Sequence, residues 1–130
     1  MANITRLYSD IDFTFTKKPV SADVALSYDA QAVVRSIRNL LNTKHYDRLF
    51  NPDLGTNLDR LLFENFSVLS NASIQKEVST MIRNYEPRAS LKSVVVSSVP
   101  DKNAYNVTIT FYIENAATPT TTTILLERNR

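Results

Sequence analysis

Tyr105-Asn-Val-Thr-Ile-Thr-Phe-Tyr-Ile-Glu114 is the stretch that decides the fold, because an apolar or aromatic residue occupies every second position. The side chains of a β-strand point to opposite faces in turn, so this period of two predicts a strand with one buried face. Ten residues of strict alternation make it the strongest strand signal in the chain. The side chains predicted to face the core are Tyr105, Val107, Ile109, Phe111 and Ile113.

The segments on either side of this strand predict two neighbours for it. Residues 91–99 are rich in valine, and Pro100-Asp101-Lys102-Asn103 joins them to the alternating strand with turn chemistry. After a break at residues 115–119, the threonine-rich segment 120–128 predicts a last strand, because threonine is β-branched. We therefore expect an antiparallel three-stranded meander whose last strand lies at an edge.

The first two-thirds of the sequence change to helical spacing. Apolar residues at i, i+4, i+7 and i+8 predict a helix over residues 29–41, and three leucines predict a short one over residues 57–65. The third helix has Ser70 or Asn71 as its expected cap, and Pro87 ends it. An alternating stretch over residues 11–16 predicts a strand ahead of the helices. The expectation is a single α+β domain over residues 1–130, with three helices on one face of a small antiparallel sheet.

Composition excludes several classes of function. The 130 residues contain no cysteine and only one glycine, Gly55, so thiolate sites and glycine-rich phosphate loops are absent from the sequence. The formal net charge is +2, without the basic stripe that nucleic-acid binding would need. No apolar run approaches the roughly 18 residues of a membrane span. We expect no nucleic acid, membrane, cofactor or metal as a partner.

The sequence gives little support to a catalytic function. Asp10, Asp12 and Glu64 are carboxylates of the kind that glycoside hydrolysis uses, but the sequence does not show the separation that such a pair requires. The one histidine, His45, lies in a polar loop without a nucleophile elbow nearby, and we interpret it as a surface residue. We expect that the protein is not an enzyme.

The tripeptide Glu86-Pro87-Arg88 follows the third helix and has two interpretations. It is either a helix stop beside an ordinary solvated ion pair, or a rigid corner that presents its arginine to a carboxylate or to backbone carbonyls of a partner. Local sequence leaves both open.

Five segments in this order resemble the baseplate wedge, or sheath-initiator, family of contractile phage tails, which is related to a type VI secretion baseplate component. They are residues 3–12, 36–41, 48–55, 62–65 and 83–88. The resemblance implies a virion protein of the tail baseplate, made in the host cytoplasm, with a fold like the assembly domain of the sheath protein. It implies a structural role in starting the sheath, and no enzymatic one.

Site residues follow from the same resemblance. Glu86, Pro87 and Arg88, with Arg48, are expected to dock on the core-bundle proteins of the wedge, and Arg88→Ala is expected to weaken docking with the fold intact. Further expected partners are the sheath protein and the tube or tube-cap proteins. The chain is expected to be a monomer in isolation, with several copies around the tail axis in the assembled tail. Pairing with a strand of the sheath, by β-augmentation, is expected at Tyr105, Val107, Ile109, Phe111, Thr121, Thr123 and Leu125.

Two alternative functions remain open, and one residue departs from the family's sequence pattern. The alternatives are a peptidoglycan-degrading tail lysozyme and an adaptor elsewhere in the tail. The departure is Tyr46, which stands where the family usually has glycine. A positive φ at this position is costly without glycine, so the loop that holds Arg48 is expected to differ in shape.

Overall fold

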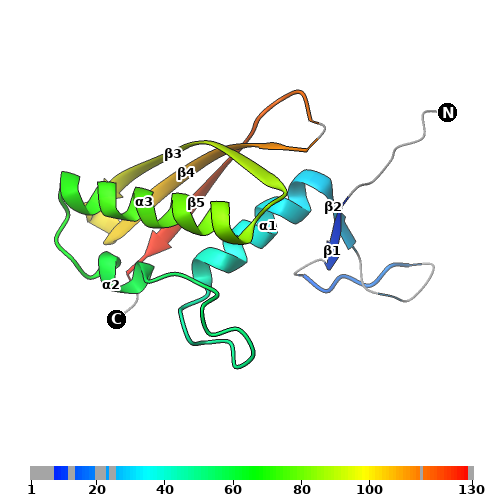
Figure 1. The fold of residues 1–130 in the computed structure, drawn as a ribbon, viewed down its shortest axis with the longest axis horizontal. Helices are drawn as coiled ribbons and strands as arrows, with labels where there is room; N and C mark the ends of the chain where they lie inside the picture. Colours follow the sequence, from blue (N-terminus) through cyan, green and yellow to red (C-terminus); the bar gives the residue numbers. More distant parts are fainter. Residues whose placement is uncertain (1–7, 12–13, 20–22, 24–25, 115, 129–130) are drawn as a thin grey trace.

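The computed structural model describes residues 8–11, 14–19, 23, 26–114 and 116–128. Figure 1 shows helices packed against one side of a curved sheet. The elements are, in order, β1 (Ser9–Ile11), β2 (Leu26–Tyr28), α1 (Asp29–Asn42), α2 (Leu58–Leu62), α3 (Val68–Tyr85), β3 (Ala89–Val99), the short 3-10 helix η1 (Pro100–Lys102), β4 (Ala104–Ile113) and β5 (Thr120–Glu127). None of the helices in the described ranges is long and apolar enough to cross a bilayer.

The three C-terminal strands form the predicted antiparallel meander in the order β3-β4-β5. Every second side chain of β4 is buried, as the period of two requires, and Phe111 and Ile109 are completely inaccessible. Asn103 takes a left-handed conformation, with φ of 48°, to close the turn between β3 and β4. A register shift between Leu91 and Ser93 marks a bulge in β3.

The core lies between this sheet and the long helices. α3 packs on β3, and α1 packs beside β5. The predicted apolar face of α1 is buried in full, and α3 buries Ile74, Val78, Met81 and Ile82. The predicted α+β arrangement is therefore confirmed, with helices on the face of the sheet that carries the buried side chains.

The start of α3 differs from the prediction. Ser67, not Ser70 or Asn71, is the cap, and its hydroxyl accepts a hydrogen bond of 3.0 Å from the backbone N–H of Ser70. Val68 and Leu69 in the first turn are 85% and 78% exposed, so the apolar period that reveals the helix starts only later. α2, at Leu58–Leu62, is shorter than the predicted helix over residues 57–65.

The first strand also differs. β1 ends at Ile11 and pairs antiparallel with β2, a strand of three residues that was not predicted. Residues 12 and 13 lie outside the described residues, and residues 14–16 do not form a strand. Phe15 is 68% exposed with φ of 48°. Ile11 is 54% exposed as well, so the two described apolar residues of this alternation do not share a buried face.

Candidate partner-binding sites

The Glu86-Pro87-Arg88 corner is built around an ion pair within the chain. Arg88 donates from Nε to Oε1 of Glu86 at 2.6 Å and from Nη2 to Oε2 at 2.9 Å, which is a two-pronged arrangement. Glu86 is only 2% exposed, whereas the side chain of Arg88 is 27% exposed. The interpretation as an ordinary solvated pair is therefore wrong, because the carboxylate belongs to the protein interior.

The electrostatic setting keeps both partners charged. Burial raises the pKa of Glu86, but hydrogen bonds from Arg88 and Ser36 outweigh burial and leave the pKa below its usual range. The hydrogen bond to Glu86 raises the pKa of Arg88. Because Nε and Nη2 serve Glu86, only the remaining guanidinium donors of Arg88 are left for a partner.

Tyr8 joins this corner to other parts of the chain. The guanidinium carbon of Arg88 lies 5.5 Å from the centre of the Tyr8 ring, close enough for a cation–π contact. The Tyr8 hydroxyl donates to Oε2 of Glu114 at 2.8 Å, and this bond is the main reason that the pKa of Tyr8 is raised. The backbone N–H of Tyr8 donates to Oδ1 of Asp29, and the backbone N–H of Asp29 donates to the Tyr8 carbonyl. Three other segments, at Tyr8, Asp29 and Glu114, are therefore linked at the corner.

Arg48 lies beside the same corner. It lines a hollow of about 380 Å³ together with Asp10, Ser36 and Tyr85. Ser36 also hydrogen-bonds Glu86, and the charge of Asp10 acts on Arg88. The residues expected to dock on the wedge core are thus brought together on one side of the molecule, although they come from distant segments.

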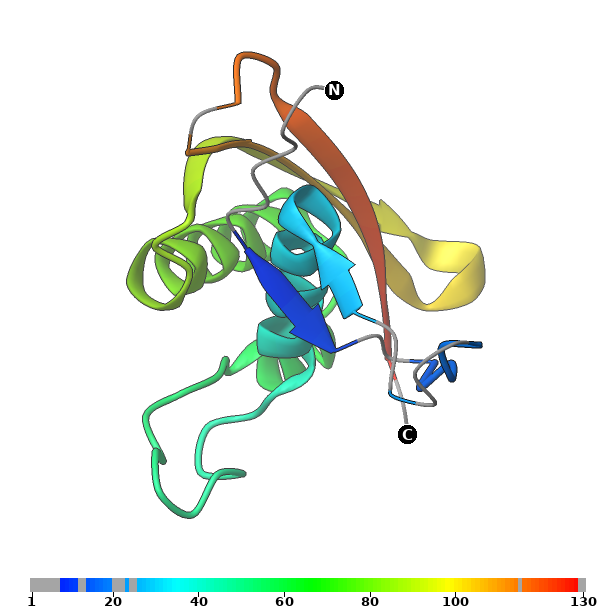
Figure 2. The same ribbon diagram turned by 90° about the vertical axis from the view of Figure 1, so that its right-hand side faces the viewer.

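The loop that carries Arg48, residues 44–55, projects from the body of the protein (Figures 1 and 2). Its base is closed by Gly55, where φ is 125° and an added Cβ would lie 2.6 Å from the Thr43 carbonyl oxygen. Leu49 and Phe50 near its tip are 92% and 102% exposed. Two large apolar side chains on a pinned loop are typical of a contact surface.

Tyr46 of this loop keeps a positive φ, at 71°, although it has a side chain. Its backbone N–H donates to the Pro52 carbonyl at 2.9 Å, which holds the conformation in place. The loop therefore adopts the left-handed conformation that glycine favours and carries the strain, at a position that is 80% exposed.

The expected strand-pairing residues divide into two groups. Tyr105, Val107, Ile109 and Phe111 lie on β4, the middle strand, which pairs with β3 on one side and β5 on the other. A central strand has no unpaired backbone to offer another chain, so these four residues are corrected to core positions. Thr121, Thr123 and Leu125 lie on β5, which is an edge strand as predicted.

The register of β5 shows which of its backbone groups are free. Ala104 lies opposite Glu127, and the N–H of Arg128 donates to the Asn103 carbonyl at 3.1 Å. Hydrogen-bonded and non-bonded pairs alternate in an antiparallel ladder, so even-numbered residues of β5 bond to β4. The N–H and C=O groups that face the open edge are those of Thr121, Thr123, Leu125 and Glu127.

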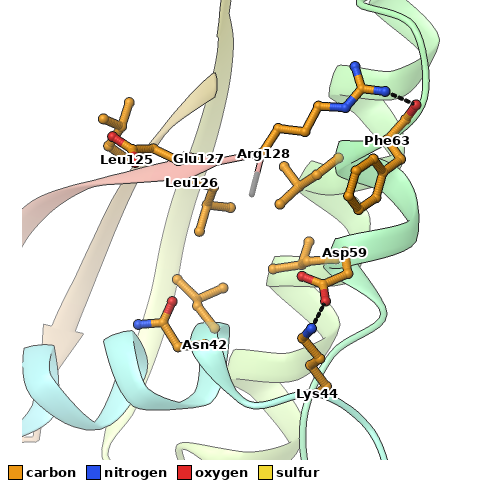
Figure 3. Close-up of a pocket in the computed structure, with 11 residues that line it drawn as sticks. Asn42, Lys44, Asp59, Phe63, Leu125, Leu126, Glu127 and Arg128 are labelled. Carbon is orange, nitrogen blue, oxygen red and sulfur yellow. Dashed lines mark hydrogen bonds and ion pairs between the residues drawn. The ribbon is translucent and has the colours of Figure 1, made fainter. Parts of the chain in front are cut away.

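The far end of β5 borders a groove with a volume of about 500 Å³ (Figure 3). Its apolar wall comes from Leu41, Leu58, Leu62 and Leu126. Charged groups form the rim, where Lys44 pairs with Asp59 and Arg128 donates to the Phe63 carbonyl at 2.8 Å. An apolar floor with a polar rim resembles the anatomy of a protein interface. Sequence reasoning missed this groove, because its walls come from three segments that only the fold brings together.

The residues considered for catalysis are not gathered into a site. Asp10 lies on β1 and Glu64 follows α2, at opposite ends of the molecule in Figure 1, while Asp12 lies outside the described residues. His45 is half-buried in the projecting loop beside Tyr46. Within the described part of the chain, no three His, Cys, Asp or Glu side chains are placed to hold a metal ion.

Comparisons with known proteins concern nearly the whole chain. The profile of a family described as baseplate wedge protein gp25 matches residues 27–118. The curated baseplate wedge protein gp25 of Enterobacteria phage T4 is 34% identical over 113 residues, which cover 87% of this chain and 85% of that protein.

Two solved structures share the fold. The crystal structure of a proposed tail lysozyme from Geobacter sulfurreducens has a TM-score of 0.74 at 22% identity, covering 82% of this chain and 96% of that one. A chain in the six-fold symmetrised cryo-EM structure of the anti-feeding prophage baseplate has a TM-score of 0.64 at 22% identity, covering 95% and 87%. At these identities the similarity concerns the fold alone.

Proposed function

The chain belongs to the baseplate wedge protein family, and we propose that it starts the sheath of a contractile tail by offering the edge of β5 to a sheath strand. As a family member it is a structural component of the phage tail baseplate and hence of the virion. The proposal adds a specific act to that role. The observation that carries it is the regular outer edge of β5, with which no strand in the described ranges pairs.

β5 suits strand addition better than the other edge. Its eight residues pair with β4 without a register shift, whereas β3 is interrupted by the bulge beside Lys92. A bulge and an edge lysine are devices that discourage pairing with another chain. A strand added to β5 would receive main-chain hydrogen bonds at Thr121, Thr123 and Leu125, and alternate side chains would set its register.

Docking on the wedge is proposed at the opposite side of α1. There Arg48 lines a hollow with Ser36, and Ser36 hydrogen-bonds Glu86 of the corner that holds Arg88 in place. The occupants would be the core-bundle proteins of the wedge, with tube or tube-cap proteins as further neighbours. Exposed Phe50 and Leu49 would add apolar contact beside the arginines.

The same proposal concerns the state of the protein before assembly and its number of copies in the tail. A single domain of residues 1–130 would stay monomeric in the host cytoplasm, because the charged residues Glu127 and Arg128 discourage self-pairing at the end of β5. Several copies would then be arranged around the tail axis by the wedge. The six-fold symmetry of the related anti-feeding prophage baseplate supports such an arrangement.

The alternative of a tail lysozyme rests on the name of one structural neighbour at 22% identity. Asp10 lies on β1 and Glu64 follows α2, and Figure 1 shows these two elements at opposite ends of the molecule. This arrangement argues against a paired-carboxylate site, whose two groups must lie close together. Turnover of purified peptidoglycan by this protein would favour the enzyme.

Proline substitutions at adjacent positions of β5 test the proposal. Thr123→Pro removes an N–H that faces the open edge, so we expect sheath polymerisation on baseplates to be blocked while the protein still folds and joins the wedge. Thr122→Pro is the matched control, because it removes an N–H that bonds to β4 and should destabilise the free protein by about 1–3 kcal/mol. Sheath assembly and thermal unfolding are measured for both variants. Normal sheath on Thr123→Pro baseplates would refute pairing through β5.

A further inference from the structure

Beyond strand pairing itself, we infer that the edge of β5 selects its strand by side chain. The selected strand carries a carboxylate and an apolar residue six positions apart. The inference rests on the proposed function, since it concerns the strand that β5 receives. It follows from two hollows that border β5, one with arginines in its lining and one with an apolar wall. They lie near opposite ends of the strand.

Both hollows lie between β5 and α1. Figure 2 shows the red strand β5 running beside the cyan helix α1. A strand added to the open edge of β5 would therefore lie along this helix. Its backbone would bond to Thr121, Thr123, Leu125 and Glu127, and half of its side chains would point to the face of the sheet that α1 covers.

The hollow at the start of β5 favours an acidic side chain. Thr120, Arg35 and Arg38 line it, within a volume of about 320 Å³. Arg38 is exposed on α1 and lines the hollow, and none of the described residues in that lining is acidic. Arginine binds carboxylates through a planar pair of donors, so an aspartate or glutamate of the incoming strand fits here.

The groove at the end of β5 favours an apolar side chain. Leu126 lines it together with Leu41, Leu58 and Leu62, and half-exposed Phe63 stands at its rim. Figure 3 shows Leu126 and Phe63 beside an open space bordered by the Lys44–Asp59 pair. An apolar anchor entering a groove with a polar rim is the usual form of an energetic centre in an interface.

The register gives the spacing. Thr120 lies opposite Phe111 and Leu126 opposite Tyr105, and both β4 residues are buried, so Thr120 and Leu126 face the same side of the sheet. Residues of an added strand opposite these two are six positions, or about 20 Å, apart and share that face. A spacing of five or seven would send one of the two side chains to the outer face. The acidic residue precedes the apolar one if the added strand runs parallel to β5, and follows it if the added strand runs antiparallel.

Peptide titrations test the inference on the full-length protein. The probes are nine-residue, threonine-rich peptides with glutamate and leucine at positions 2 and 8, in both orders. Binding is followed by NMR through the backbone amides of Thr121, Thr123, Leu125 and Glu127. We expect the better order to bind about fivefold more tightly than the same peptide with lysine for glutamate. Serine in place of leucine is expected to weaken binding about tenfold.

Variants of the protein identify the two ends. Arg38→Glu is expected to reverse the preference from the glutamate to the lysine peptide, while Lys76→Glu on α3, a charge reversal away from β5, leaves it unchanged. Phe63→Ser is expected to weaken the leucine peptide about fivefold and to leave the serine peptide unchanged.

The outcomes separate the two claims. Equal shifts of the edge amides with every peptide, unaffected by Arg38→Glu, would overturn the selection rule and leave strand pairing in place. Shifts confined to amides outside β5, or none with any peptide at millimolar concentration, would remove strand pairing through β5 and the selection rule with it.

Discussion

At the scale of single residues, the Glu86–Arg88 pair ties a docking motif to the stability of the fold. Because Glu86 is 2% exposed, removing Arg88 alone would leave a buried carboxylate without its main partner. Breaking one side of such a pair generally costs about 3–5 kcal/mol, less here because Arg88 is partly exposed. The expectation that Arg88→Ala leaves the fold intact therefore needs correction, and loss of binding by that variant would not prove docking.

A double substitution separates the two roles. In Glu86→Leu with Arg88→Met, both charges are replaced by apolar groups of similar size, which is often nearly neutral for stability. We expect thermal unfolding within a few degrees of the wild type, but much weaker binding to the core-bundle proteins of the wedge by calorimetry. Wild-type affinity in this folded variant would exclude the motif from the interface.

The same pair predicts a pH dependence. The pKa of Glu86 is lower in the folded protein than in the unfolded chain, so ionised Glu86 stabilises the fold at pH values above its ordinary pKa of 4.5. That contribution is lost as the pH falls through the lower folded pKa. Glu86→Gln is expected to be less stable than the wild type at pH 7, and the difference should shrink below about pH 4. Denaturant unfolding across pH 3–7 measures this difference, and a constant gap would contradict it.

At the scale of elements, the loop over residues 44–55 contains two residues with a positive φ, Tyr46 and Gly55. Substitutions at these two positions are expected to change stability in opposite directions. Gly55→Ala forces a Cβ to within 2.6 Å of a backbone oxygen, so we expect a loss of about 2 kcal/mol or more. Tyr46→Gly relieves strain at φ of 71° and should stabilise the protein by roughly 0.5 kcal/mol. Denaturant unfolding of both variants checks the two signs. A stable Gly55→Ala protein would show that the base of the loop can open.

The elements that periodicity could predict are those with one buried face over many residues. α1 and the meander were predicted within one or two residues, because Val33 and Ile109 belong to long regular patterns. The cap of α3 was misplaced because exposed Val68 and Leu69 interrupt the pattern. β2 was missed because three residues carry no period, and its pairing with β1 is a tertiary event.

The sites were less predictable than the elements. Nothing local to Glu86 indicates burial, which depends on Ser36 and on the docking of β1. The groove beside Leu126 and the hollow beside Arg38 are formed by α1, α2 and β5 together. Such sites belong to the tertiary arrangement, and single-segment patterns do not contain it.

At the scale of the whole molecule, the hollows beside the proposed docking and strand-pairing surfaces lie against different residues of α1. If both proposals hold, loss of the protein should arrest tail assembly. In particles from a phage with a nonsense codon in this gene, electron microscopy is expected to show baseplates with bare tubes, or unjoined wedges. The stage of arrest separates sheath initiation from wedge assembly. Complete sheathed tails that fail only in infection would favour the enzyme or a different tail adaptor.

The bond between Tyr8 and Glu114 spans 106 positions of the chain. During translation, Glu86 and Arg88 leave the ribosome well before Glu114, so the bond between Tyr8 and Glu114 forms only after β4 has been made. A prematurely terminated chain would contain the docking tripeptide without its finished surroundings. The bond between Tyr8 and Glu114 thus couples the last contact at the corner to the synthesis of β4.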